Sequence, residues 1–322
     1  MKNIFVSLIL IFTSSVVFAT KPNNVVLLGI FTETNGCMGM RLTKDIIITA
    51  AHCLTQIINV DSSVYIDFKY SDTAKEYIAV ISGGPKQNSN ADVYFHTQGY
   101  QPGESDIVAD TYGDLALIKI KGPINAVNIA SSNQNYKNLP PQIKNMMMFA
   151  LKNEQKKYDE NYNNFMNIPL ENYKVFALPS SSNNVPEFFK EMEIHSYVSA
   201  CQESDNACLY RKPVEEHSGT FQGIRDDSPK TIGWNLPIQK GESGSPVIDT
   251  KNKRFFGAIS GPCNDAAQTM RIDENVCSTF LSKLGIKCEI ENPPQENENK
   301  GGNQKVSKKQ KPILKHTKPT KK

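Results

Sequence analysis

The sequence predicts an all-β fold of the barrel or sandwich type. Three observations lead to this class: the apolar segments are short, they are rich in β-branched residues, and turn-forming residues separate them. The segments expected to form strands are residues 46–48, 64–68, 77–81, 92–96, 115–120, 146–151 and 254–260.

The strand at 46–48 leads to a candidate base. It is followed by the small residues 49–51 and then by His52, the one histidine of five that lies directly after a strand and a tight bend. A strand end of this kind can hold an imidazole ring still, as a catalytic base requires.

A candidate orienting acid precedes the strand at 115–120. Asp114 comes directly before this alternating apolar segment. The strand can therefore hold the Asp114 carboxylate at a fixed, buried position in the protein. The nearby Asp106 and Asp110 are expected to be solvated loop residues.

A candidate nucleophile lies in the turn Gly-Glu-Ser-Gly-Ser at 241–245, which runs into the apolar strand after Pro246. Alone, a Gly/Ser cluster indicates only a tight turn. With a base and an acid elsewhere in the chain, Ser243 becomes a plausible nucleophile.

The last predicted element is a C-terminal helix over residues 274–285. Asp273 is a typical helix cap, and the apolar side chains share one helical face. These side chains are Val276, Phe280, Leu281 and Leu284.

The two ends of the chain differ from its body. Residues 1–19 have a basic start, an apolar stretch and a small-residue site after Ala19, which predicts a secretory signal peptide and a protein that is extracellular or periplasmic. No later segment is apolar for long enough to span a membrane.

Residues 289–322 lack apolar periodicity and predict a disordered Lys-rich tail. The formal charge of the whole chain is +3; leaving out Lys2 and the nine lysines from Lys300 onward gives −7 for residues 20–299. The tail either only solubilises the chain or contacts anionic surfaces. It has no aromatic residue that could stack on a base, so we expect no specific nucleic-acid binding.

Seven cysteines in an exported chain predict disulfides with at least one thiol left over. Cys201 and Cys208 are the closest local pair, and the pairing of Cys263, Cys277 and Cys288 stays open. No pair of cysteines has zinc-ligand spacing, so we expect neither a metal nor a cofactor.

The three candidate motifs together resemble the chymotrypsin/trypsin-like serine proteases. They are Thr-Ala-Ala-His-Cys at 49–53, Asp-Leu-Ala-Leu at 114–117 and Gly-Glu-Ser-Gly-Ser-Pro at 241–246, in the order His, Asp, Ser. The stretches 234–247 and 271–281 further resemble the bacterial glutamyl endopeptidases.

The resemblance implies two six-stranded antiparallel β-barrels within a peptidase domain at 20–288. The first barrel would occupy about 24–132 and the second about 142–275, with a polar linker near 131–142. It also implies a disulfide between Cys37 and Cys53 beside the histidine.

The resemblance implies roles for the candidate residues. His52 would act as base, Asp114 would orient it, and Ser243 would attack a peptide carbonyl, with the backbone N–H groups of Gly241 and Ser243 as oxyanion hole. The substrate-binding residues would be Pro237, Ile238, Gln239, Ile259, Ser260 and Gly261.

Several positions depart from the family patterns. Pro237 stands where trypsin-like enzymes carry a pocket Asp, and Ile259 stands where glutamyl endopeptidases carry a His, which favours an apolar or small pocket. Glu242 replaces an Asp that pairs with a newly cut N-terminal amine, and no Ile-Val-Gly-Gly start is present. Three alternatives follow: signal removal alone yields the working enzyme, Glu242 has another partner, or the loop is badly ordered. We expect the first.

The leading interpretation is a secreted, monomeric serine endopeptidase that acts on polypeptides. The main alternative is a binding or adhesion protein on a protease scaffold with weak or no turnover. An α/β-hydrolase esterase is a weaker alternative: Ser245 occupies the last Gly position of that family's Gly-x-Ser-x-Gly elbow, and its histidine follows the serine.

Overall fold

The computed structural model describes residues 21–30, 36–55, 57, 62–72, 74–85, 89–96, 113–178, 189, 192–199, 214–224, 231–238, 241–263 and 266–290. Several predictions lie outside these residues: the signal peptide at 1–19, the loop acids Asp106 and Asp110, the pairing of Cys201 with Cys208, the pocket residue Gln239 and the tail from residue 291 onward.

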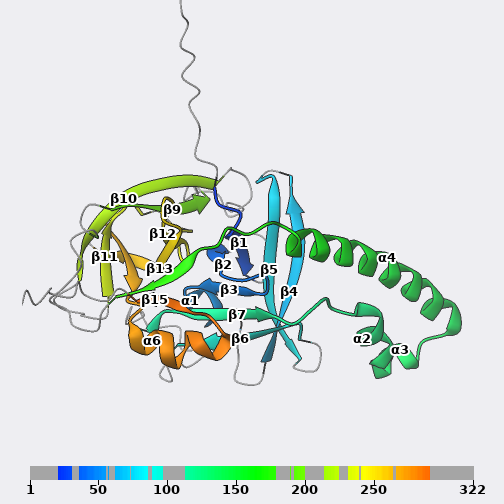
Figure 1. Ribbon diagram of the computed structural model, residues 1–322. Helices are drawn as coiled ribbons and strands as arrows, with labels where there is room; N and C mark the ends of the chain where they lie inside the picture. Colours follow the sequence, from blue (N-terminus) through cyan, green and yellow to red (C-terminus); the bar gives the residue numbers. More distant parts are fainter. Residues whose placement is uncertain are drawn as a thin grey trace, which may run out of the picture. The chain divides into compact units, whose positions relative to one another are not determined.

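The first part of the chain forms a closed β-barrel, in the strand order β1-β2-β3-β7-β6-β4-β5 (Figure 1). Parallel pairing of Leu27 with Ile78 joins β1 to β5 and closes it. The barrel has seven strands, where the family resemblance implied six. The strands are β1 Val25–Ile30, β2 Gly36–Arg41, β3 Ile46–Thr49, β4 Ser62–Ser71, β5 Glu76–Pro85, β6 Ala91–Phe95 and β7 Ala116–Ile120.

The second part of the chain forms a six-stranded barrel in the order β12-β9-β10-β11-β14-β13, which pairing of β12 with β13 closes. β8 and β15 extend the sheet beyond β13. The strands are β8 Lys174–Ala177, β9 Glu193–Ser199, β10 Val214–Ile224, β11 Thr231–Asn235, β12 Pro246–Asp249, β13 Arg254–Cys263, β14 Ala266–Met270 and β15 Cys288–Ile290. The fold class is therefore the predicted one, two β-barrels with a C-terminal helix.

Three helices join the barrels, and here the sequence prediction was wrong. The helices are α2 Ala126–Ser132, α3 Gln134–Lys137 and α4 Pro141–Met166. Residues 146–151 are therefore part of a helix, not a strand, and neither the polar linker at 131–142 nor the second barrel's expected start at 142 is found there. Proline in the first turn and the many Met, Ala, Leu, Lys and Gln residues favour a helix over this stretch.

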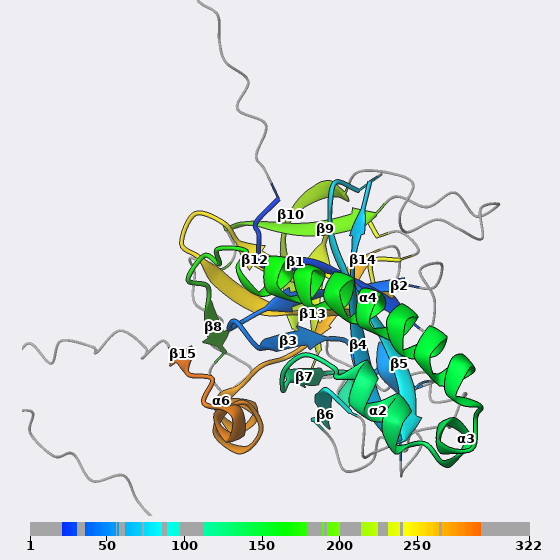
Figure 2. The same ribbon diagram turned by 90° about the vertical axis from the view of Figure 1, so that its right-hand side faces the viewer.

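The C-terminal half of α4 is fixed to the first barrel. The ring of Phe68 in β4 lies 4.6 Å from that of Phe165 and 5.6 Å from that of Tyr162. The buried guanidinium of Arg41 lies 4.4 Å from the Phe165 ring and donates a 2.8 Å hydrogen bond to the Phe165 carbonyl. Burial lowers the pKa of Arg41 to about 10. Figure 2 shows α4 running across the outside of the strands β4 and β5.

A shared apolar core holds the two barrels together. One cluster of buried residues contains Leu27 and Leu117 of the first barrel, Ala258 and Met270 of the second, and Phe280 of the C-terminal segment. Two further clusters fill the interiors of the individual barrels. Side chains placed where the barrels meet are therefore held from both sides.

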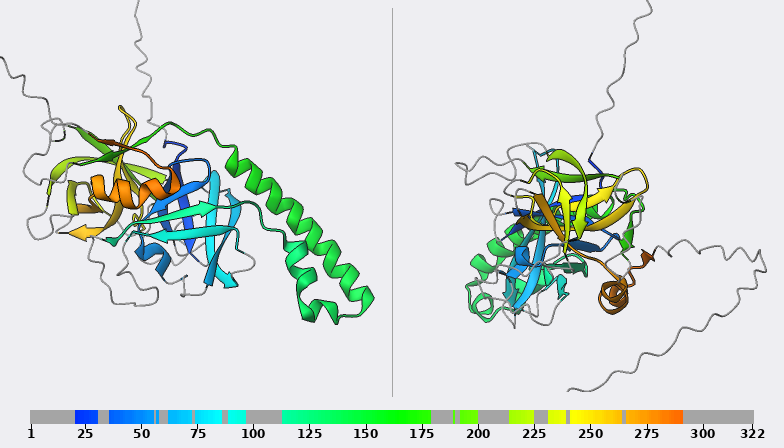
Figure 3. Two further views of the ribbon diagram at one scale, coloured as in Figure 1. Left: turned by 60° about the horizontal axis from the view of Figure 1, so that its bottom comes forward. Right: turned by 90° about the vertical axis from the view of Figure 1, so that its left-hand side faces the viewer.

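The C-terminal segment forms helix α6 Glu274–Thr279 and a 3-10 helix at Leu281–Leu284 (Figure 3). Asp273 caps α6, as predicted, by accepting a 2.9 Å hydrogen bond from Val276 N. Glu289 belongs to β15, which pairs with β8, so the predicted start of the disordered tail at 289 was too early. A disulfide joins Cys277 to Cys288. Among the described helices, none combines the length and the apolar composition needed to cross a bilayer.

Candidate active site

Strand pairing brings His52 and Asp114 together. β3 ends at Thr49, which pairs with Ala116 of β7, so the residues just after β3 and just before β7 are neighbours. His52 Nδ1 donates a 2.7 Å hydrogen bond to Asp114 Oδ2. The carboxylate is fully buried, whereas about a third of the imidazole is exposed. The ring is thus fixed on one side and accessible on the other.

The Asp114 carboxylate accepts hydrogen bonds from three donors. Its Oδ1 accepts from the backbone N–H of His52 at 2.8 Å, at the start of the short helix α1 His52–Thr55. Its Oδ2 accepts from the imidazole and from the hydroxyl of Ser260 in β13. Three donors on one carboxylate fix both of its oxygens in position.

Ser260 makes a contact that the sequence did not predict, and its place among the substrate-binding residues stays a prediction. Its hydroxyl comes from the second barrel and orients the acid of the first. No local sequence signal could have shown this contact, because 146 positions separate Ser260 from Asp114.

The turn that carries Ser243 is pressed against the strands that lead to His52. The Ser243 carbonyl accepts a 2.7 Å hydrogen bond from Met38 N in β2. Gly244 has a φ of +79°, and a Cβ at this position would lie 2.2 Å from both the Met38 carbonyl oxygen and Thr49 Oγ1. Only glycine allows this approach, which places the turn against the residues immediately before His52.

Hydrogen bonds within the second barrel fix the other side of the turn. Gly244 N donates to the Ile259 carbonyl at 2.7 Å, and Ile259 N donates to the Ser245 carbonyl at 2.8 Å. Ser245 Oγ accepts from Tyr197 N at 2.9 Å and donates to the Tyr197 carbonyl. Gly241 has a φ of +98°, which also favours glycine.

The Ser243 side chain itself is half-buried. Within the described part of the chain, its hydroxyl makes no hydrogen bond to His52. Catalytic hydrogen bonds are often long in the absence of substrate and tighten when substrate binds.

Glu242 has an internal partner, which answers the question that the missing N-terminal motif raised. Its carboxylate is fully buried, and Oε1 lies 2.7 Å from Nδ1 of His217 in β10. The same nitrogen lies 3.1 Å from the Pro237 carbonyl oxygen. The pKa of His217 is raised, chiefly by its hydrogen bond to Glu242. The sequence analysis did not single out His217, since no motif surrounds it.

The predicted pocket residues lie in different surroundings. Pro237 is exposed, whereas Ile238 is half-buried and packs against the core of the second barrel. The Ile259 side chain is fully buried in that core, so its backbone faces the Ser243 turn but its side chain lines no open surface. A Cβ on Gly261 would meet no atom within 4 Å.

The disulfide that the resemblance implied between Cys37 and Cys53 is present, with Cα atoms 6.2 Å apart. Ligand atoms of Cys37, His52 and Cys53 lie within 4.8 Å of one another. The two sulfurs are bonded to each other, so this group is a covalent brace beside His52 and not a set of free metal ligands.

Comparison with known proteins agrees with this fold. The family model described as Trypsin matches residues 18–158, a stretch that contains His52 and Asp114. This part of the chain therefore carries a trypsin-family domain match. The curated protein sequences give no match.

Solved structures of similar fold share little sequence with this chain. The inactivated protease paralogue S-D1 of the scabies mite is 14% identical, with a TM-score of 0.46, and the alignment covers 84% of this chain and 97% of that one. A mutant of human heparin binding protein is 12% identical, with a TM-score of 0.41, over 78% of this chain and 88% of that one.

Proposed function

We propose that this protein is a secreted serine endopeptidase of the trypsin family. The observation that carries the proposal is the buried Asp114 carboxylate, which accepts from His52 Nδ1 at 2.7 Å while the Ser243 turn is packed against the strands before His52. A neutral imidazole held in this tautomer can accept the proton of an attacking hydroxyl.

The proposed reaction uses groups of both barrels. Ser243 Oγ attacks the peptide carbonyl, and its proton passes to His52 Nε2. His52 then donates that proton to the leaving amine, and water hydrolyses the acyl-enzyme by the same path. Asp114 stabilises the imidazolium, and the N–H groups of Gly241 and Ser243 stabilise the oxyanion.

The pair of His217 and Glu242 supports activity without a newly cut N-terminus. Glu242 directly precedes Ser243, so the position of its side chain constrains the backbone of the oxyanion turn. A buried carboxylate with a hydrogen-bonded cation is held in place from within the folded chain. Signal removal alone would then leave a competent site.

The alternative is a binding protein on the same fold with weak or no turnover. The absence of a hydrogen bond between the Ser243 hydroxyl and His52 in the described part of the chain favours this alternative. The two proposals make opposite predictions about peptide turnover.

A peptide-library digest tests the proposed peptidase activity and, in the same experiment, measures which side chains the enzyme prefers next to the cleaved bond. The purified mature protein is incubated with a mixed peptide library, and the cleavage sites are identified by mass spectrometry. We expect cleavage with a preference for small or apolar side chains before the scissile bond, and none from Ser243→Ala. A folded wild-type protein that cleaves no peptide would support the binding protein. Hydrolysis of simple esters without peptide cleavage would indicate an esterase.

A further inference from the structure

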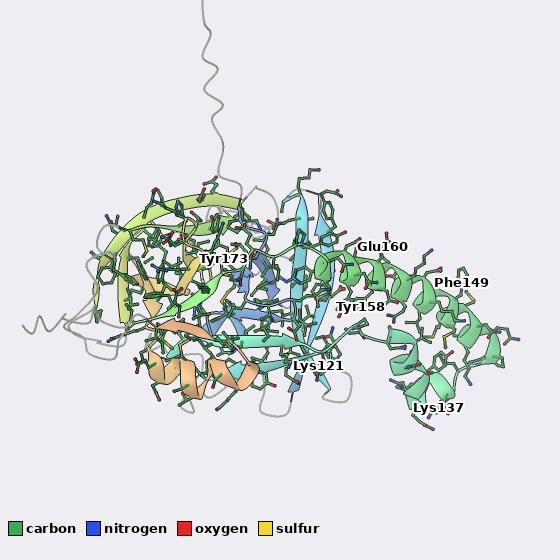
Figure 4. All side chains as sticks on the ribbon, in the orientation of Figure 1. Lys121, Lys137, Phe149, Tyr158, Glu160 and Tyr173 are labelled. Atoms are coloured by element: carbon green, nitrogen blue, oxygen red, sulfur yellow. A yellow bond between two sulfur atoms is a disulfide. The ribbon has the colours of Figure 1, made fainter. Side chains whose placement is uncertain are left out.

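Helix α4 carries an exposed apolar surface near its N-terminal end. Met146 and Phe149 are each 70% exposed, Ile143 is 43% exposed and Met147 is 41% exposed. We call these four residues the apolar tip. Their spacing of three and four residues brings them together on adjoining parts of the helix surface. Figure 4 shows Phe149 on the part of α4 that lies away from the barrels.

The C-terminal half of α4 is already occupied by the first barrel. Tyr158, Tyr162 and Phe165 pack against Phe68 of the first barrel. Closer to the tip, Gln155 donates a 2.6 Å hydrogen bond to the Ile124 carbonyl and accepts one from Ala126 N, which fixes α2 against α4. The apolar tip is thus carried by a helix that contacts with the barrel and with α2 hold in place.

Lysines predominate around the apolar tip, and Glu154 is the first acidic residue after it. Residues 121–153 contain no Asp or Glu but four lysines, Lys121, Lys137, Lys144 and Lys152. Lys144 Nζ donates a 2.6 Å hydrogen bond to the Lys137 carbonyl, so both lysines lie at this end of the helical segment. Figure 4 places Lys137 beside the same end of α4 as Phe149. The body of the chain, residues 20–299, has the opposite formal charge of −7.

We propose that the apolar tip docks into the headgroup region of an anionic phospholipid bilayer. Apolar side chains flanked by lysines are the combination that binds such an interface, because the lysines attract the surface and the apolar groups enter it. The Lys-rich tail has the same sign of charge as the lysines around the tip, so the same anionic surface would attract it. This proposal does not depend on the proposed catalysis.

A tryptophan reporter tests the proposal in the full chain. Trp234 is the only tryptophan and is fully buried in the second barrel, so its emission should not respond to lipid. In Phe149→Trp, the emission at the tip should shift to the blue with vesicles containing phosphatidylglycerol, and brominated lipid should quench it. Purely phosphatidylcholine vesicles should give at least about tenfold weaker partitioning.

Three matched variants locate the contact. Tyr70→Trp places the reporter at another exposed aromatic position, 47% exposed in β4, and should show no shift. In the Phe149→Trp background, Met146→Ser together with Ile143→Ser should weaken the shift about tenfold. Replacing Lys137, Lys144 and Lys152 by Gln in that background should weaken it as well. Circular dichroism checks that each variant stays folded.

Three outcomes would overturn the proposal. If Phe149→Trp sediments with anionic vesicles while the emission of its reporter stays unchanged, the tail binds lipid and the tip does not. If neutral and anionic vesicles give equal shifts, the lysines do not select the surface. If the shift appears without vesicles and grows with protein concentration, a second copy of the chain covers the tip.

Discussion

The half-buried His217 and the fully buried Glu242 form a pair directly beside the candidate nucleophile, with Nδ1 and Oε1 2.7 Å apart. His217 belongs to β10 and Glu242 to the turn that contains Ser243. The contact therefore connects strand β10 of the second barrel to the turn at 241–245. This turn would supply the Ser243 hydroxyl and the N–H groups of the oxyanion hole.

Removing the imidazole should disturb this turn. His217→Gln leaves the fully buried Glu242 without its cation, and we expect the free energy of unfolding to fall by about 3 kcal/mol and kcat to fall more than KM rises. His195→Gln is the matched control, because His195 Nδ1 also pairs with a glutamate, Glu216, at 2.9 Å, but away from Ser243. Equal losses of kcat in the two variants would contradict the positioning role of His217.

The stabilisation from this pair should depend on pH. The pKa of His217 is raised in the folded protein, first by Glu242 and in smaller part by Glu215. The contribution is therefore complete below about pH 6.5, the ordinary histidine value, and is lost as the pH rises through the raised value. The difference in unfolding free energy between wild type and His217→Gln, measured in denaturant across this range, should shrink with rising pH. A difference that grows would contradict the assignment.

The hydroxyl of Ser260 should support the base through Asp114. Ser260→Ala removes one of the three donors to the buried carboxylate, and we expect kcat to fall about tenfold with little change in KM. Ser260→Thr keeps a hydroxyl and should recover most of the activity. A rise in KM alone would instead mean that Ser260 binds substrate, as the sequence first suggested.

Glycine at position 244 should be needed for its close approach as well as for its backbone angle. Gly244→Ala would bring a Cβ against the Met38 carbonyl oxygen and Thr49 Oγ1. Gly285 has a similar φ of +76° but open space around the Cβ position, so Gly285→Ala measures the backbone strain alone. We expect Gly285→Ala to cost about 1 kcal/mol and Gly244→Ala clearly more, together with loss of activity. If the two variants lose equal free energy of unfolding, measured by heat or denaturant, then close packing around Gly244 does not stabilise the turn at 241–245.

The sequence predicted the parts of the site that local patterns encode. His52 and Asp114 each adjoin an apolar strand, and Ser243 lies in a Gly/Ser turn, so strand ends and turn chemistry were enough to single them out as candidates. The contacts of Ser260 with Asp114 and of His217 with Glu242 depend on how strands distant in sequence pair. Local patterns in a single sequence do not reveal that pairing.

The helical segment was missed for a related reason. Residues 146–151 are a short apolar run, and such a run does not distinguish a strand from a helix by periodicity alone. The residues that follow decide in favour of a helix. Tyr158 and Phe165 are spaced so that both aromatic rings contact the barrel from one side of a helix. No local sequence pattern predicts which side chains of α4 are exposed, because their exposure depends on which parts of the helix the rest of the fold covers.

Covalent labelling tests whether Ser243 is a nucleophile that His52 activates. The mature protein is treated with an organophosphonate probe, and the modified residue is identified by peptide mass spectrometry. We expect one labelled residue, Ser243, with labelling lost in Ser243→Ala and strongly slowed in His52→Ala. A folded protein that takes up no label, or that is labelled at Ser243 equally fast without His52, would contradict it.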